Sequence, residues 1–450
     1  MDCQSKKVMV IGAGVSGLAA ACQLKKQGFS VKVVDKAQRA GGVISTFSQD
    51  GFYAESGSNV IFIQSSTVLD FIYELGLSDK LQFSSKSAKK RYFVRSGEML
   101  ALPTNPFSMI FTKLLSFAGK IRIFKEISVP AHDFDSEVSV SQFMTDRFGQ
   151  EFCDYIINPF MGGIYASSPD RLSVKYAMPK VWQIEQKYGS LIKGAFCMLR
   201  ELRENKTKRF KSKMASFKGG MQTFIDAMAA YLGGDLSVNC KVLSIDYNDG
   251  KWDILTEEGG DSYDEIVFAV PAHKIKNVPI TGNMSVALGS FNEIEYAPIA
   301  TLTLGFDLKQ FKKKPQGFGV LVPQKENMSI LGSLFLSSIF PDRAPENCCV
   351  LTNYFGGFRN PEMVEKPIEE LVELACKDLQ KLMGLKGAPK FAKLTVWKKG
   401  IAQYNIGYDK FIEAKDEFEK QYPSIKLVGS YMGGVGVGKC IENALQAVSK

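Results

Sequence analysis

A glycine-rich turn between two short apolar segments constrains this chain more than any other feature. The apolar run 8–11 is typical of a buried parallel strand, and the turn 12–17 that follows leads into a helix-forming stretch. A second apolar run, 31–34, ends at Asp35. The order strand, glycine turn, helix, strand, acid predicts a dinucleotide-binding unit within an α/β fold.

Each part of this unit has a physical role. Gly12 allows the tight turn, Gly14 lets the backbone approach a pyrophosphate, and Gly17 lets helix and strand pack closely. Asp35 lies 35 − 14 = 21 residues past Gly14, where its carboxylate can accept hydrogen bonds from ribose hydroxyls. An acid there disfavours a 2′-phosphate, so NADP is excluded, whereas FAD and NAD remain open. The expected contacts are Gly12, Ala13, Gly14, Val15, Ser16, Gly17, Asp35 and Lys36.

Three later segments favour FAD. The segments 39–42 (Arg-Ala-Gly-Gly), 55–59 (Glu-Ser-Gly-Ser-Asn) and 217–221 (Phe-Lys-Gly-Gly-Met) resemble, in that order, elements of the FAD-linked oxidases related to monoamine oxidase. Taken singly, the paired glycines could be plain turns. The resemblance implies further FAD contacts at Arg39, Gly42, Val43, Gly57, Ser58, Asn59, Val60, Val242 and Trp397.

A second glycine-rich turn, 433–438, lies near the C-terminus. It follows the predicted strand 426–430 and precedes a predicted helix, 440–449. Four glycines in six residues bring the backbone close to a ligand, so we expect the chain to return to the cofactor at Val435, Gly436 and Val437. Because no Cys or His stands in an evident linkage motif, we expect FAD to be noncovalent.

Composition excludes several other classes of protein. The 450 residues include nine Cys, with no CxxC pair, and only two His, which argues against a disulfide framework or a metal site. The net charge of +9 favours acidic ligands or anionic membranes. Nucleic acid is not expected, because no binding motif accompanies the charge. We predict an α/β (mixed α+β) protein: a Rossmann-like FAD-binding domain (1–85, 211–280 and 411–450), a helical, membrane- or substrate-binding domain (86–210) and a mixed-sheet substrate domain (281–410).

From about residue 7 to residue 448 the chain resembles the oxygen-dependent protoporphyrinogen oxidases. The segments 158–166, 170–173, 180–192 and 429–442 carry this resemblance beyond the general amine-oxidase pattern. It implies oxidation of a porphyrinogen in haem synthesis, with dioxygen reoxidising FAD to release hydrogen peroxide. Coproporphyrinogen as substrate, another enzyme of the amine-oxidase superfamily, and an FAD-binding scaffold without turnover remain alternatives.

The same resemblance assigns substrate contacts. Arg91 would pair with a propionate, since guanidinium suits carboxylate, although it could also be a solvated arginine in a basic run that includes Lys90 and is followed by Arg95. That extra charge would favour substrates with more carboxylates. The other expected contacts, which outside the resemblance would be interpreted as core, are Gly163, Phe318, Leu321 and Tyr354.

A basic, aromatic-rich stretch at 107–125 predicts either a helix lying on an anionic bilayer or one packed on the substrate domain. The basic run 203–213 is more typical of a solvated loop. We expect a cytoplasmic protein, with peripheral contact on the inner face of the cell membrane as the alternative to a freely soluble one. Both a monomer and a homodimer remain open.

Overall fold

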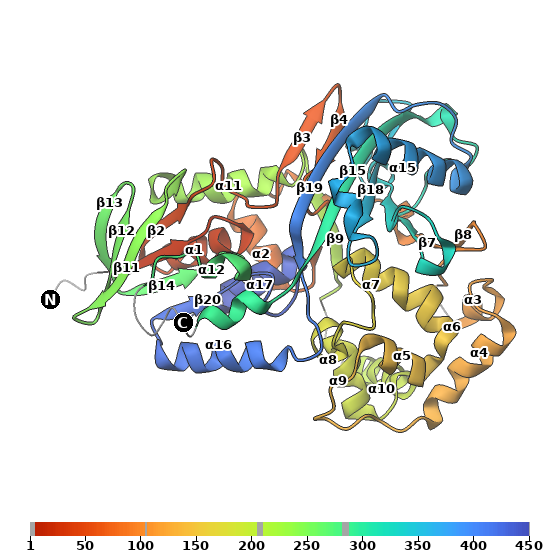
Figure 1. Ribbon diagram of the computed structural model, residues 1–450, viewed down its shortest axis with the longest axis horizontal. Helices are drawn as coiled ribbons and strands as arrows, with labels where there is room; N and C mark the ends of the chain where they lie inside the picture. Colours follow the sequence, from red (N-terminus) through yellow and green to blue (C-terminus); the bar gives the residue numbers. More distant parts are fainter. Residues whose placement is uncertain (1–4, 104–105, 205–209, 281–287, 450) are drawn as a thin grey trace.

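The computed structural model describes residues 5–103, 106–204, 210–280, 288–449. Figure 1 shows two halves: a sheet flanked by helices at the left, with both termini, and at the right a second large sheet above a group of helices. The protein is therefore a mixed α/β fold, as predicted from the sequence.

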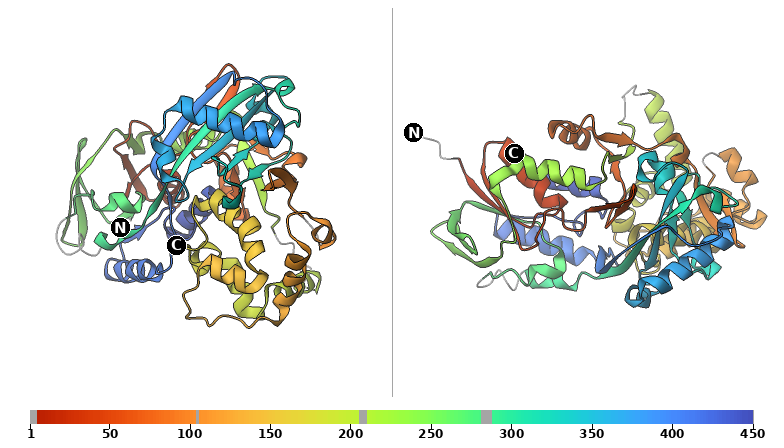
Figure 2. Two further views of the ribbon diagram at one scale, coloured as in Figure 1. Left: turned by 45° about the vertical axis from the view of Figure 1, so that its right-hand side comes forward. Right: turned by 90° about the horizontal axis from the view of Figure 1, so that it is seen from above.

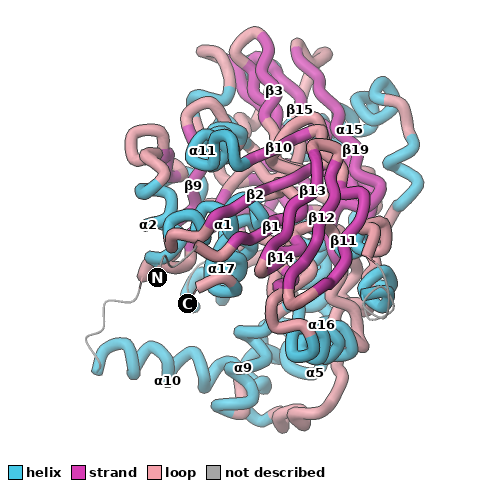
Figure 3. Tube along the Cα trace, turned by 90° about the vertical axis from the view of Figure 1, so that its left-hand side faces the viewer, coloured by secondary structure: helices cyan, strands magenta, loops and turns pink. Residues whose placement is uncertain are grey.

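The first half is built on a five-stranded parallel sheet. Its order is β10 (Leu236–Val238), β2 (Ser30–Asp35), β1 (Lys7–Ile11), β14 (Glu265–Phe268) and β20 (Ile425–Leu427). One face packs against α1 (Val15–Lys26), α11 (Gln222–Leu232) and α17 (Val437–Ala447), and the other against α16 (Asp409–Gln421) and an antiparallel sheet of β11 (Val242–Asn248), β12 (Lys251–Thr256) and β13 (Gly259–Tyr263) (Figure 3). Coverage on both faces explains why these strands are continuously apolar.

The second half is built on a seven-stranded mixed sheet, here called the large sheet. Its order is β19 (Phe391–Ala402), β15 (Tyr296–Asp307), β18 (Cys348–Gly356), β17 (Gly332–Leu334), β16 (Gly319–Leu321), β7 (Arg91–Arg95) and β8 (Glu98–Ala101). Helix α15 (Ile368–Met383) covers one face of it. Strands β7 and β8 fall in the range predicted to be helical; they are strands because β7 pairs in parallel with β16, more than 200 residues later.

The helical lobe, α3 to α10, lies below the large sheet in Figure 2 (left). Helix α17 begins at Val437, before the predicted start at residue 440, because Gly436 is its extended N-cap residue. No helix in the described part of the chain has the length and apolar character needed to cross a membrane. The lobe helices are α3 (Pro106–Phe111), α4 (Phe117–Phe124), α5 (Val140–Phe148), α6 (Gln150–Phe152), α7 (Asn158–Tyr165), α8 (Val174–Ala177), α9 (Pro179–Tyr188) and α10 (Leu191–Glu204).

Shorter elements connect the two halves. They are β3 (Thr46–Gln49) paired with β4 (Phe52–Glu55), the sheet of β5 (Ile61–Ile63), β9 (Lys213–Phe217) and β6 (Leu81–Phe83), and the helices α2 (Ser66–Glu74), α12 (Ala272–Ile275) and α14 (Leu336–Ile339).

Candidate functional site

The turn between β1 and α1 needs glycine at two positions for packing and leaves space at a third. Gly12 has a φ of +108°, and a Cβ there would lie 2.8 Å from the Ala269 carbonyl oxygen. A Cβ on Gly17 would lie 1.9 Å from the Gly12 oxygen. A Cβ on Gly14, the N-cap residue of α1, would meet no atom within 4 Å. The backbone at Gly14 therefore faces open space, as an approaching pyrophosphate requires.

The C-terminal glycine turn has the same property. Gly436 is the N-cap residue of α17, and a Cβ on it would meet nothing within 4 Å. The first turns of α1 and α17 lie together, with the Cys440 thiol interacting with the Ser16 side chain. Two helix N-termini thus present free N–H groups and positive dipole ends to one region, which suits a pyrophosphate. Val15 belongs to the first turn of α1, and Val435 and Val437 flank Gly436.

Asp35 has a second role that the sequence did not reveal. Its carboxylate accepts hydrogen bonds from the N–H groups of Ala13 (2.7 Å) and Ala37 (2.9 Å), and so it braces the glycine turn. Each carboxylate oxygen retains capacity for another donor, so ribose hydroxyls still fit. The segment leading to Val242 lies alongside, because the Cys240 N–H donates to the Asp35 carbonyl. The neighbouring Lys36 is exposed.

The loop after β2 is held by its own arginine. Arg39 donates to the carbonyls of Ala40 (3.1 Å), Gly42 (3.0 Å) and Ile44 (2.8 Å). A Cβ on Gly42 would lie 3.4 Å from the Gly14 Cα, so this loop lies beside the first glycine turn. The guanidinium thus shapes the loop near the expected pyrophosphate position.

Loop 56–60 joins the first half, which is built on the parallel sheet and is called the cofactor half below, to the large sheet. The Trp397 indole N–H donates to the Ser56 carbonyl (2.7 Å), and the Asn59 amide donates to the Tyr354 hydroxyl (2.8 Å). The Thr352 hydroxyl donates to the Asn59 side-chain oxygen (3.3 Å). Gly57 lies against the preceding loop, because a Cβ on it would lie 2.5 Å from the Val43 carbonyl oxygen. Inside loop 56–60, the Ser58 hydroxyl donates to the Val60 carbonyl.

The register of the large sheet brings the predicted substrate contacts to one face. Arg91 pairs with Gly319, and both Leu321 and Tyr354 pair with Gly332, so these side chains lie on the face away from α15. Gly332 leaves room for the Leu321 side chain, since a Cβ on Gly332 would lie 3.0 Å from a Leu321 methyl carbon. A Cβ on Gly163 of α7 would lie 2.7 Å from a Leu321 methyl carbon, so the helical lobe closes on the same strand.

Arg91 and Arg95 differ in their partners. The Arg91 guanidinium stacks over the Phe318 ring (5.1 Å to the centroid) and has no carboxylate partner among the described residues. Arg95, at the other end of β7, pairs with Glu151 (2.7 Å). The expectation that Arg95 adds free positive charge near the anchor is therefore wrong, because its charge is neutralised.

Glu55 is a buried carboxyl next to loop 56–60 that sequence reasoning did not single out. It accepts hydrogen bonds from the Thr46 hydroxyl (2.7 Å) and the Met221 N–H (3.0 Å). Burial raises its pKa to about 7. Glu55 thus links the start of loop 56–60 to the turn at 217–221. Because Glu55 and Met221 are 166 residues apart, no local sequence pattern predicts their contact.

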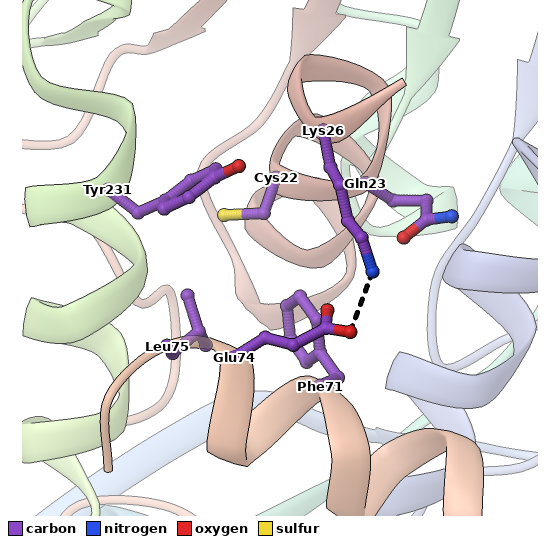
Figure 4. Close-up of a pocket in the computed structure, with 7 residues that line it drawn as sticks. All are labelled: Cys22, Gln23, Lys26, Phe71, Glu74, Leu75 and Tyr231. Atoms are coloured by element: carbon purple, nitrogen blue, oxygen red, sulfur yellow. Dashed lines mark hydrogen bonds and ion pairs between the residues drawn. The ribbon is translucent and has the colours of Figure 1, made fainter. Parts of the chain in front are cut away.

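A cavity of about 230 Å³ lies elsewhere, between α1, α2 and α11 (Figure 4). The ion pair Lys26–Glu74 (2.6 Å) lies at this cavity, and none of the predicted site residues lines it. Among the described residues, no three or more His, Cys, Asp or Glu side chains are grouped to hold a metal ion. The geometry thus points to the two glycine turns and the large-sheet face as the functional region.

Comparison with known proteins agrees with this geometry. Residues 15–450 match the family of flavin containing amine oxidoreductases. The chain is 36% identical to protoporphyrinogen oxidase 2 of Arabidopsis thaliana, over 98% of this chain and 93% of that protein. It is 27% identical to coproporphyrinogen III oxidase of Staphylococcus aureus, over 99% of each.

Solved structures show the same fold. A putative protoporphyrinogen oxidase from Exiguobacterium sp. 255-15 superposes with a TM-score of 0.82 at 23% identity, over 99% of this chain and 98% of that one. A reduced UDP-galactopyranose mutase superposes with a TM-score of 0.73 at 17% identity, over 99% and 95%. The open backbone at Gly14 and Gly436 fits FAD, and the chain belongs to the flavin containing amine oxidoreductases as an FAD-dependent oxidoreductase enzyme.

Proposed function

We propose that this enzyme oxidises a porphyrinogen to the corresponding porphyrin in haem biosynthesis. The observation that carries the proposal is Arg91, a guanidinium without a carboxylate partner in the described part of the chain. It lies on the face of the large sheet that contacts loop 56–60 through the Asn59–Tyr354 hydrogen bond. An apolar macrocycle with propionates could pack its rings on such a face and pair a propionate with Arg91. The names of the relatives, protoporphyrinogen and coproporphyrinogen III oxidases, support the same substrate class.

The residues of this chain bind and orient. Arg91 pairs with a propionate, and Leu321, Phe318 and Tyr354 form an apolar wall against which Gly163 lets α7 approach. When bound, FAD would supply a two-electron acceptor for the hydride lost from a saturated bridging carbon, and dioxygen would be the final oxidant, leaving as hydrogen peroxide. Three such oxidations remove six electrons and consume three dioxygen molecules. The pyrrole nitrogen lone pairs assist loss of hydride, so no strong general base is needed.

Protoporphyrinogen IX is the proposed substrate, and coproporphyrinogen III is the second candidate. Pairing of Arg95 with Glu151 leaves Arg91 as the anchor on this strand, which suits a substrate with few carboxylates. Turnover of both porphyrinogens by the purified holoenzyme, followed by porphyrin fluorescence, tests this choice. Faster turnover of coproporphyrinogen III would reverse it, and no fluorescence with either would reject the proposed function.

The role of Arg91 is tested by Arg91→Ala, with Lys90→Ala as the matched control. We expect the KM of the arginine variant to rise about tenfold or more with little change in kcat, because an interaction made equally in ground and transition states is lost. The lysine variant should keep the KM of the wild type, since Lys90 lies over the Tyr92 ring instead. An unchanged KM in Arg91→Ala rejects Arg91 as the anchor.

FAD is proposed to be noncovalent. Cys440 is the cysteine at the first turn of α17, and it is buried with a pKa raised to about 12 by desolvation. Such a thiol stays protonated and is a poor nucleophile. Acid precipitation should therefore release all the flavin into the supernatant.

We propose that this protein is cytoplasmic and makes peripheral contact with the inner face of the cell membrane. The proposal is based on the aromatic side chains of α3 and α4. Phe111, Phe117 and Phe124 are 69%, 79% and 68% exposed, while Leu114 and Leu115 between the helices are buried. The stretch thus contains both buried and exposed apolar side chains. The side chains of Phe107 and Ile110, and most of the basic run 203–213, lie outside the described residues. Flotation with anionic liposomes at low salt tests this contact, and absence of binding rejects it.

A further inference from the structure

The Tyr354 hydroxyl accepts a hydrogen bond and has no acceptor for its own hydrogen among the described residues. The Asn59 amide donates to it at 2.8 Å. The Asn59 side-chain oxygen accepts from Thr352, whose hydroxyl lies 3.3 Å from that of Thr303. Asn59, Thr352 and Thr303 are all buried, so this chain of side chains fixes the phenol oxygen.

The phenol acts as a donor and not as a base. Burial raises the pKa of Tyr354 far above its ordinary value, so the hydroxyl keeps its proton across the physiological range. The Tyr354 side chain is partly buried, and Asn59 holds its oxygen in place, so its hydrogen is available to an acceptor outside the described side chains. The corresponding acceptor must lie in the region between loop 56–60 and the large sheet, since Tyr354 joins the two.

We propose that Tyr354 is a positioning residue that donates its phenolic hydrogen to the isoalloxazine ring of FAD. The edge of that ring carries carbonyl oxygens and ring nitrogens that accept. A porphyrinogen ring presents pyrrole N–H donors to the pocket, and its acceptors are confined to the propionates, for which Arg91 is the proposed anchor. The inference requires FAD, and it does not depend on turnover of a porphyrinogen.

Such a hydrogen bond favours the reduced cofactor. Reduction adds electron density to the ring, and hydrogen bonds to a more negatively charged acceptor are stronger. Tyr354 therefore raises the tendency of the flavin to take electrons. Removing the hydroxyl should shift the reduced-to-oxidised equilibrium about tenfold toward the oxidised form, which is about 30 mV for two electrons.

The test compares Tyr354→Phe with Tyr176→Phe in the FAD-loaded protein, without any porphyrinogen. Tyr176 is the matched control because its hydroxyl bonds to Asp409 on α16, away from the glycine turns and the large sheet. The visible flavin bands and the midpoint potential are measured, the latter by reductive titration against a dye of known potential. We expect shifted bands and a lower potential in Tyr354→Phe, and wild-type values in the control.

Thr352→Val provides a second variant, which keeps the phenol and removes the hydroxyl that orients Asn59. A smaller shift in the same direction supports the proposal even where Tyr354→Phe fails to fold. Wild-type bands and potential in both variants overturn it. A raised KM for porphyrinogen, with unchanged bands and potential, also overturns it by assigning the acceptor to the substrate.

Discussion

The first glycine turn and the helical lobe stabilise their conformations in opposite ways. The turn after β1 prepares for an anion with backbone N–H groups and with the open space beside Gly14. The lobe instead buries full charges: Arg147, Glu126 and Glu185 are each 0% exposed. A site for a charged ligand uses the partial charges of backbone N–H groups, which need no partner before the ligand binds. The lobe instead pairs its buried charges with one another.

The buried charges of the lobe form a connected cluster. Arg147 donates to Glu126 (2.9 Å) and, through Nε, to Glu185 (2.7 Å). His132 places its two ring nitrogens 2.9 Å from Glu185 and 3.3 Å from Asp146. Because Glu126 also accepts from the N–H groups of Leu191 and Ile192, the cluster anchors the start of α10. It therefore ties α5, α9 and α10 to the segment after α4.

Arg147→Met should have the largest effect on stability. It leaves Glu126 and Glu185 buried without their cation, which costs about 3–5 kcal/mol of unfolding free energy. Urea unfolding measures this loss, with Lys410→Met as control because its ion pair with Glu293 is exposed and is worth about 0–1 kcal/mol. Equal losses in the two variants would contradict a central role of the buried cluster.

Gly14→Val should affect the cofactor and spare the fold. Gly14 has an ordinary φ of −72°, and nothing lies within 4 Å of its Cβ position, so a side chain fits until FAD binds. We expect FAD affinity to fall about 100-fold, or about 2.7 kcal/mol, while the apoprotein loses no more than about 1 kcal/mol for the changed N-cap residue. Flavin fluorescence quenching and calorimetry measure the two quantities.

The contrast is Gly17→Ala. Its Cβ would lie 1.9 Å from the Gly12 oxygen, so this smaller substitution should lower the melting temperature of the apoprotein itself. If Gly17→Ala were as stable as the wild type, or if Gly14→Val lowered the melting temperature more than Gly17→Ala, the assignment of one glycine to packing and the other to the ligand would be wrong.

What the sequence predicts here depends on how far apart the interacting residues lie. The turn at 12–17 and its acid at Asp35 are predictable because their spacing is local and backbone geometry requires glycine. The contact of Glu55 with Met221, the pairing of β7 with β16 and the neutralisation of Arg95 by Glu151 span 56 residues or more, and no short pattern signals them. The substrate contacts on the large-sheet face could be predicted from the family resemblance alone. Without it, aromatic and branched residues in strands would be interpreted as core residues.

Glu55 gives the cofactor half a pH dependence of its own. Its carboxyl is 2% exposed, and its pKa rises from 4.5 to about 7 in the fold, so the folded state holds the proton more tightly than the unfolded chain. This stabilisation is complete below about pH 4.5 and is lost as the pH rises through about 7. Glu55→Gln should remove a decline of about 2 kcal/mol between pH 5 and pH 7. Urea midpoints across this range measure it, and parallel curves for variant and wild type would refute it.

Replacing Phe117 and Phe124 together by Ser should have the smallest effect on stability, because both side chains are already in water. We expect the unfolding free energy to change by less than about 0.5 kcal/mol. Binding to anionic liposomes should nevertheless fall severalfold, since these rings supply exposed apolar area next to basic side chains. Phe143→Ser, a fully buried ring of the same lobe, is the control and should destabilise the fold strongly. Loss of stability in the double variant would mean that α4 packs against the lobe more tightly than the exposure of its phenylalanines indicates.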